Sequence, residues 1–168
     1  MPKLIVIFSI CSLLFPAGAA SADLKPKERG SDTVLIEADR LDVSIERGSA
    51  IFKGNVRAVK GDMDLRAQTA TLHYDRASRR VTTLVADGAV SILWGGRHAS
   101  CDKATWRIQD QVMELLGNVT IVQGAESISG QRVSVDLRRN TQTVEGGQGR
   151  VKVRVETDGQ TGIMQWRK

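Results

Sequence analysis

Residues 117–137 read GNVTIVQGAESISGQRVSVDL, and this stretch predicts the fold of the chain. It opens with Gly117, carries a second glycine seven residues later, and reaches a third small residue at Gly130. Apolar side chains then follow at alternate positions, at Val133, Val135 and Leu137. Alternation with a period of two is typical of a β-strand that has one apolar face.

The same pattern begins again at Gly54 and at Gly88, and its second half also occurs near residue 38. The small residues of the four copies are Ala38, Ala67, Cys101 and Gly130, spaced 29, 34 and 29 residues apart. The apolar residues that follow them are Leu41, Val43 and Ile45; Ala70, Leu72 and Tyr74; Ala104, Trp106 and Ile108; and Val133, Val135 and Leu137. The longer middle spacing fits a longer turn at residues 75–80. Four aligned copies indicate a true internal repeat.

Within each copy the apolar phase reverses next to the small residue. Ile36 and Ala38 share one phase, for example, whereas Leu41 and Val43 have the other. A reversal at the same place in every copy predicts a bulge or bend where the strand turns a corner. Short strands joined at corners and turns predict an all-β fold, a coiling pair of antiparallel sheets of the jelly-roll kind.

The N-terminal residues have the features of an export signal. Lys3 precedes an apolar run from residue 4 to residue 15, and Ala20-Ser21-Ala22 offers small residues for cleavage. The run is about twelve residues, short of the roughly twenty that a membrane-spanning helix needs. We therefore predict a signal peptide at 1–22, a flexible lead-in at 23–33, a folded domain at 34–156 and a flexible C-terminal tail at 157–168.

Composition argues against several classes of function. The formal net charge is +5, and the charges are spread along the chain, which fits a solvated face or a mild attraction to phosphate-rich partners. Cys101 is the one cysteine beyond residue 22, and no cluster has metal-ligand spacing. The acids fall mostly on the polar phase, so they do not form the facing carboxylate pair of a glycan hydrolase. We expect no catalytic residues, no metal, no cofactor and no nucleic-acid partner.

Residues 150–155 alternate cation and valine without interruption. The pattern predicts an edge strand, and two interpretations of its charges remain open. They discourage mispairing of the edge, or the edge pairs with another molecule.

Three segments carry a resemblance to a known family: residues 36–43 (IEADRLDV), 52–56 (FKGNV) and 116–119 (LGNV). They resemble the LptA/OstA-like family of periplasmic lipopolysaccharide-transport proteins over roughly residues 34–146. The middle copy departs from the pattern, because Gly88-Ala89-Val90 replaces Gly-Asn-Val and Cys101 replaces Ala or Gly.

The resemblance implies an open β-jelly-roll that associates head to tail in the periplasm. It also implies a bridge between an inner-membrane LptC-like component and an outer-membrane LptD-like component, with the lipid A part of lipopolysaccharide as cargo. The soluble bridging component of the family fits best. A purely structural β-filament without lipid is the first alternative, and a periplasmic glycan-active enzyme is the second.

On this hypothesis the inward apolar residues line a groove for acyl chains, whereas residues alone would indicate an ordinary β-sandwich core. His73 is out of phase with its neighbours and is expected to face solvent. The predicted groove residues are Ile36, Leu41, Val43, Ile45, Leu72, Tyr74, Trp106, Ile108, Val133, Val135 and Leu137.

Overall fold

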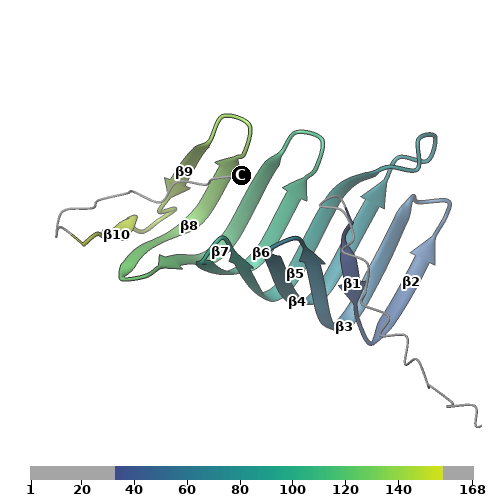
Figure 1. The fold of residues 1–168 in the computed structure, drawn as a ribbon, viewed down its shortest axis with the longest axis horizontal. Coiled ribbons are helices and arrows are strands. Elements are labelled where there is room, and N and C mark those ends of the chain that lie inside the picture. Colours follow the sequence, from purple (N-terminus) through teal and green to yellow (C-terminus); the bar gives the residue numbers. More distant parts are fainter. Residues whose placement is uncertain (1–32, 157–168) are drawn as a thin grey trace, which may run out of the picture.

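The computed structural model describes residues 33–156, which form one antiparallel sheet of ten strands (Figure 1). The predicted signal peptide, most of the lead-in and the C-terminal tail lie outside the described residues. The strands are Leu35–Glu37 (β1), Arg40–Ser44 (β2), Ser49–Lys60 (β3), Met63–Tyr74 (β4), Val81–Trp94 (β5), Arg97–Arg107 (β6), Val112–Gln123 (β7), Glu126–Asp136 (β8), Thr141–Glu145 (β9) and Lys152–Arg154 (β10). No helix occurs within this range, and the predicted all-β class is confirmed.

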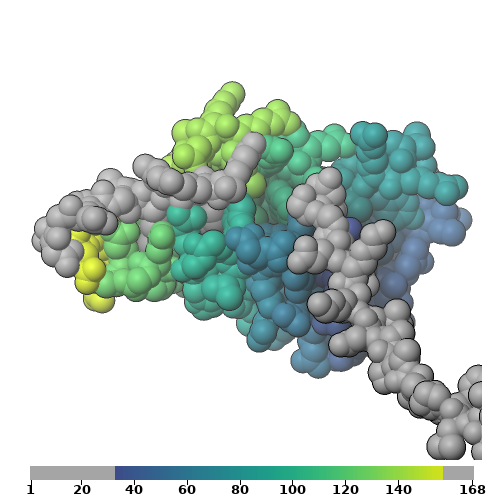
Figure 2. All heavy atoms as spheres, in the orientation of Figure 1, coloured from purple at the N-terminus to yellow at the C-terminus, as the bar shows by residue number. Residues whose placement is uncertain are grey.

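Successive long strands pair in sequence order from β3 to β8. β1 and β2 both pair with β3, and β9 and β10 both pair with β8. Each of these short pairs therefore acts as one strand that is interrupted at the corner. Figures 1 and 2 show the resulting order along the longest axis, with β2 toward one end and β9 and β10 toward the other.

The predicted corners exist, and each one is a β-bulge. Between β3 and β4 the register shifts at Gly54 and Asn55, which lie opposite the single residue Gln68. Both bulge residues have positive φ, 76° at Gly54 and 47° at Asn55. Because two residues of β3 lie opposite one residue of β4, the alternation of inward and outward side chains continues unchanged along β3 and reverses along β4. This explains why the apolar phase reverses after Ala67 in the sequence. The same shift recurs between β5 and β6 and between β7 and β8.

The bulges divide the sheet into two parts. The first half-sheet comprises β1, β10 and residues 56–60, 63–67, 90–94, 97–101, 119–123 and 126–130. The second half-sheet comprises β2, β9 and residues 49–53, 69–74, 81–87, 103–107, 112–116 and 132–136.

One apolar core lies between the two half-sheets. Val56, Ile92 and Ile121 contribute to it from the first half-sheet, and Leu115 and Val133 from the second. All five are at most 3% exposed. The two parts therefore fold toward each other about the corner, which is the arrangement of an open β-jelly-roll.

Amide–carboxylate hydrogen bonds hold two of the bulges in place. Asn55 Nδ2 donates to Asp39 Oδ2 at 2.8 Å, and Asn118 Nδ2 donates to Asp102 Oδ2 at 3.0 Å. The middle corner has Gln68 and Ala89 at the matching positions, so the sequence departure seen there removes this amide–carboxylate bond and keeps the bulge.

Gly117 and Gly124 allow a matched test of the bulge. Both have positive φ, 77° and 59°, so alanine at either costs roughly 1–2 kcal/mol for the left-handed backbone. A Cβ on Gly117 would also lie 2.8 Å from the Asp102 Cβ, whereas no atom lies within 4 Å at Gly124. We expect Gly117→Ala to lower the free energy of unfolding by about 1–3 kcal/mol more than Gly124→Ala. Denaturant unfolding of the two variants measures the difference. Equal losses in the free energy of unfolding would contradict the close approach of Gly117 to Asp102 at this corner.

Candidate functional site

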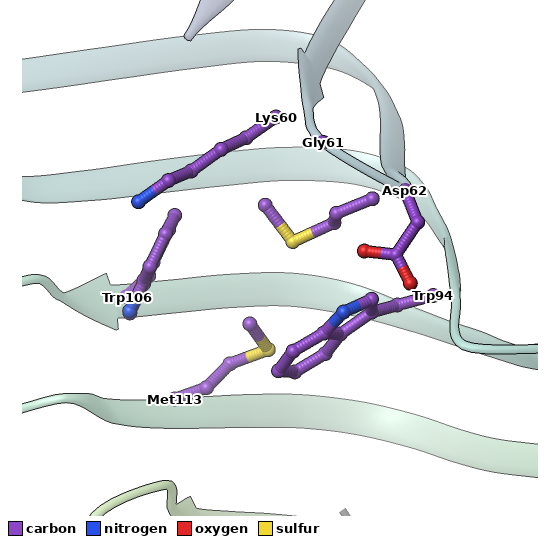
Figure 3. A pocket seen from close by; sticks show the side chains of 7 residues that line it. Lys60, Gly61, Asp62, Trp94, Trp106 and Met113 are labelled. Atoms are coloured by element: carbon purple, nitrogen blue, oxygen red, sulfur yellow. The ribbon is translucent and has the colours of Figure 1, made fainter. Parts of the chain in front are cut away.

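Two apolar cavities open on the inner face of the sheet, and both are lined by Trp106 and Lys60. The first has a volume of about 410 Å³ and lies at the turn between β3 and β4. Its lining residues are Lys60, Gly61, Asp62, Met63, Trp94, Trp106 and Met113. Figure 3 shows the Trp106 and Trp94 rings on two sides of this cavity with Met113 between them.

The second cavity has a volume of about 380 Å³ and lies nearer to β1 and to the turn between β4 and β5. It is lined by Val34, Ile36, Lys60, Leu72, Arg80, Val81, Leu84, Trp106 and Ile108. Ile36 belongs to the first half-sheet and Leu72 to the second, so this cavity is bounded by both parts of the folded sheet.

A void of about 10 Å³ lies between the half-sheets beside Trp106. Met63 and Met113 line both this void and the first cavity, and Leu84 lines both the void and the second. The two cavities are therefore neighbours along one apolar wall. Each has a volume within the range of about 300–1,000 Å³ that is usual for small-molecule sites.

Trp106 occupies the centre of this arrangement. The Lys60 Nζ atom lies 5.1 Å from the centroid of its ring, a cation–π contact that Figure 3 shows from the side of the first cavity. The Trp106 Nε1 atom is buried and has no hydrogen-bond partner among residues 33–156. The wall around the ring consists mainly of Met, Leu, Ile and Val side chains, so it fits an apolar ligand.

The structure places four of the predicted groove residues together in the second cavity: Ile36, Leu72, Trp106 and Ile108. Tyr74 is half-buried beside the edge, and its hydroxyl donates to the Ser44 carbonyl oxygen at 3.4 Å. Exposed His73 precedes it on the strand.

The remaining predicted residues lie away from the two cavities. Val133 and Val135 are fully buried in the core, and Leu137 is half-buried against it. Leu41, Val43 and Ile45 are 52%, 59% and 79% exposed.

Cross-strand pairing explains the position of β2. Leu41 pairs with Phe52, which in turn pairs with the fully buried Ala70. Directly paired residues share a face of the sheet, so Leu41 is on the inner face as predicted. It is exposed because β2 is an edge strand, with β3 as its one neighbour among the described strands.

Sequence reasoning missed several lining residues. Leu84 had a detectable signal, because it alternates with Ala86 on the apolar phase of β5. Lys60 and Arg80 had no such signal: they lie at the end of β3 and just before β5, and the sequence does not show that these turns meet at one cavity.

Cys101 is a packing residue in the first half-sheet, where it is 5% exposed. Burial raises the pKa of its thiol to about 11, so the neutral thiol is the form present at neutral pH. Among residues 33–156 no group of three His, Cys, Asp or Glu side chains is placed to hold a metal ion. No helix in that part of the chain has the length and hydropathy to cross a membrane.

Comparison with known proteins identifies the family. Residues 35–160 match the sequence model of a family described as LptA/(LptD N-terminal domain) LPS transport protein. The chain belongs to this family. It is therefore a lipopolysaccharide-transport protein, related to proteins that transport without catalysing a reaction.

Two curated proteins are similar to this chain. An uncharacterised protein of Rhizobium meliloti (strain 1021) is 25% identical over 149 residues, which cover 83% of this chain and 80% of the relative. The LPS-assembly protein LptD of Aliivibrio fischeri is 28% identical over 110 residues, 65% of this chain. The match spans 13% of that LptD, so the likeness concerns one part of it.

A solved structure shares the fold. LptH of Pseudomonas aeruginosa, described as the LptA-homologous periplasmic component of the lipopolysaccharide transport device, aligns with a TM-score of 0.65. The alignment covers 74% of this chain and 95% of LptH, at 16% sequence identity. The open β-jelly-roll predicted for the LptA/LptD N-terminal family is thereby confirmed.

Proposed function

We propose that the chain is a periplasmic carrier that holds the acyl chains of lipid A between its half-sheets and leaves the sugars in water. The observation that carries the proposal is the pair of apolar cavities that share Trp106. Each methylene moved out of water contributes about 0.8 kcal/mol, so a single fourteen-carbon chain exposed in the periplasm costs on the order of 10 kcal/mol. A family of lipopolysaccharide-transport proteins needs such a shelter.

Export to the periplasm rests on the sequence of residues 1–22 and on the description of LptH as a periplasmic component. The apolar run, the following small residues and the single preceding lysine favour a cleaved signal.

The ends of the sheet support a bridging role. Within residues 33–156, β1 and β2 pair on one side only, as do β9 and β10 at the opposite end. Exposed apolar side chains accompany these edges, among them Leu41 and Val43 on β2 and Val153 on β10. Unpaired edges of this kind add strands from another chain. We propose head-to-tail self-association and contact with LptC-like and LptD-like domains through these two ends.

The alternative function, a filament without lipid cargo, also depends on the edge strands, but it gives the two cavities no role. Purified protein is expected to bind fluorescent lipopolysaccharide saturably, with competition by unlabelled lipopolysaccharide, and to sediment as larger species at higher concentration. Self-association without lipid binding would favour the filament. If the protein binds lipid and stays monomeric at every concentration, the proposed carrier function stands and the proposed head-to-tail self-association is wrong.

A further inference from the structure

The second cavity carries two cations and no acid among its lining residues. Lys60 lies at the end of β3 and Arg80 in the turn before β5, and both line the cavity together with apolar side chains. Asp62, the acid nearest in sequence to Lys60, lines the first cavity and not the second. A mainly apolar cavity with two positively charged residues in its lining fits a ligand that has an apolar part and an anionic part.

Neither cation has an ion-pair partner within residues 33–156. Cations elsewhere on β3 and on β6 do have partners. Arg57 of β3 lies 2.7 Å from Asp64, and Arg107 of β6 lies 3.1 Å from Glu114. The pairing that neutralises neighbouring cations is therefore missing at this cavity.

The Lys60 ammonium instead lies on the Trp106 ring, 5.1 Å from its centroid. A cation–π contact is weaker than a charge-assisted hydrogen bond from an ammonium to a phosphate oxygen. An anion at the cavity mouth would therefore draw Lys60 away from Trp106. Because the ring lines both cavities, this movement would also change the wall between them.

We infer that Lys60 and Arg80 form a binding site for a phosphate group of the lipid headgroup, at the mouth of the cavity that takes an acyl chain. The inference rests on the proposed function and assigns the residues that recognise the polar part of the cargo. Arginine and lysine are the side chains that bind phosphate in proteins, the first through paired N–H groups and the second as a point charge. The site thus selects phosphorylated acyl sugars over neutral lipids with the same chains.

The test compares diphosphoryl lipid A with dephosphorylated lipid A of the same acylation, bound to the full chain at one ionic strength. The wild type is expected to bind the phosphorylated lipid about tenfold more tightly. Lys60→Gln combined with Arg80→Gln is expected to remove this preference, so that the affinities of this variant for the two lipids differ by no more than about twofold. Retained binding of the dephosphorylated lipid also shows that the double variant is folded.

The matched control replaces Arg47 and Arg79 by glutamine. Both are exposed residues of connecting segments outside the cavity lining, and neither has a side-chain partner among the described residues. Each double variant removes two positive charges, so the change in net charge is the same. The control is expected to keep the wild-type preference. An equal loss in the control would assign the preference to the overall positive charge and overturn the site.

Three further results would also contradict the inference. Equal affinity of the wild type for the two lipids would contradict phosphate recognition and leave the proposed carrier function standing. Binding of neither lipid would overturn the proposed function as well. Displacement of diphosphoryl lipid A by inorganic phosphate at equimolar concentration would show a site for free phosphate and not for a lipid headgroup.

Discussion

Replacing Leu115 by alanine is expected to lower the free energy of unfolding by about 2–5 kcal/mol. Leu115 lies on β7, is fully buried, and is paired between Ala104 of β6 and Val133 of β8. These neighbours are small or fully buried side chains of the sheet, so they cannot move to fill the space that the leucine leaves. Chemical denaturation with a far-ultraviolet or fluorescence signal measures the loss.

Leu41→Ala is the matched control, because the same chemical change is made at a leucine that is 52% exposed on the edge strand β2. We expect this variant to unfold within about 1 kcal/mol of the wild type. Similar losses at Leu41 and Leu115 would contradict the placement of the core between the half-sheets.

Replacing Ile108 by asparagine is expected to weaken lipopolysaccharide binding by about tenfold to a hundredfold. Ile108 is half-buried in the turn just after β6 and lines the second cavity. Water can reach the new amide in the empty protein, but an acyl chain in the cavity would remove that water without offering a hydrogen bond. The cost therefore falls on the bound state, and titration with fluorescent lipopolysaccharide measures it.

Gln109→Asn, at the exposed next position, is the control for this variant. It keeps the polarity of that residue and does not touch the cavity, so its affinity should equal that of the wild type. An Ile108→Asn variant that binds as tightly as this control would show that the acyl chains are held elsewhere.

The repeat made the strands and the corners predictable, because both follow from local backbone chemistry. A small residue and a phase reversal at Ala67 and Gly130 indicated a bend, and the structure has β-bulges there. What the sequence did not show was the other half of each bulge. Gly54 with Asn55, and Gly117 with Asn118, supply the two residues with positive φ that lie opposite a single one.

The sequence also predicted which residues lie on the inner face of the sheet, but it did not predict how exposed each of these side chains is. Alternation places Leu41 and Val133 on the same face, yet one is 52% exposed and the other is 0% exposed. The difference depends on how many strands lie on either side of each residue, which is a property of the whole sheet. The groove residues remain a prediction, with Ile36, Leu72, Trp106 and Ile108 now gathered at one cavity.

The cationic part of the cavity was outside the reach of pattern analysis. Lys60 and Arg80 lie twenty residues apart at turns, where hydrophobic periodicity gives no information. Their common position follows from the folding of β3, β4 and β5 against one another.

Site-specific photo-crosslinking in cells tests the central claim that lipid lies on the inner face of this sheet. Leu72 lines the second cavity, and His73, one residue further along β4, is exposed. A photoreactive amino acid at Leu72 or at Trp106 is expected to capture lipopolysaccharide, and the same probe at His73 is expected to capture little or none. Equal capture at all three positions, or capture at none, would contradict the account.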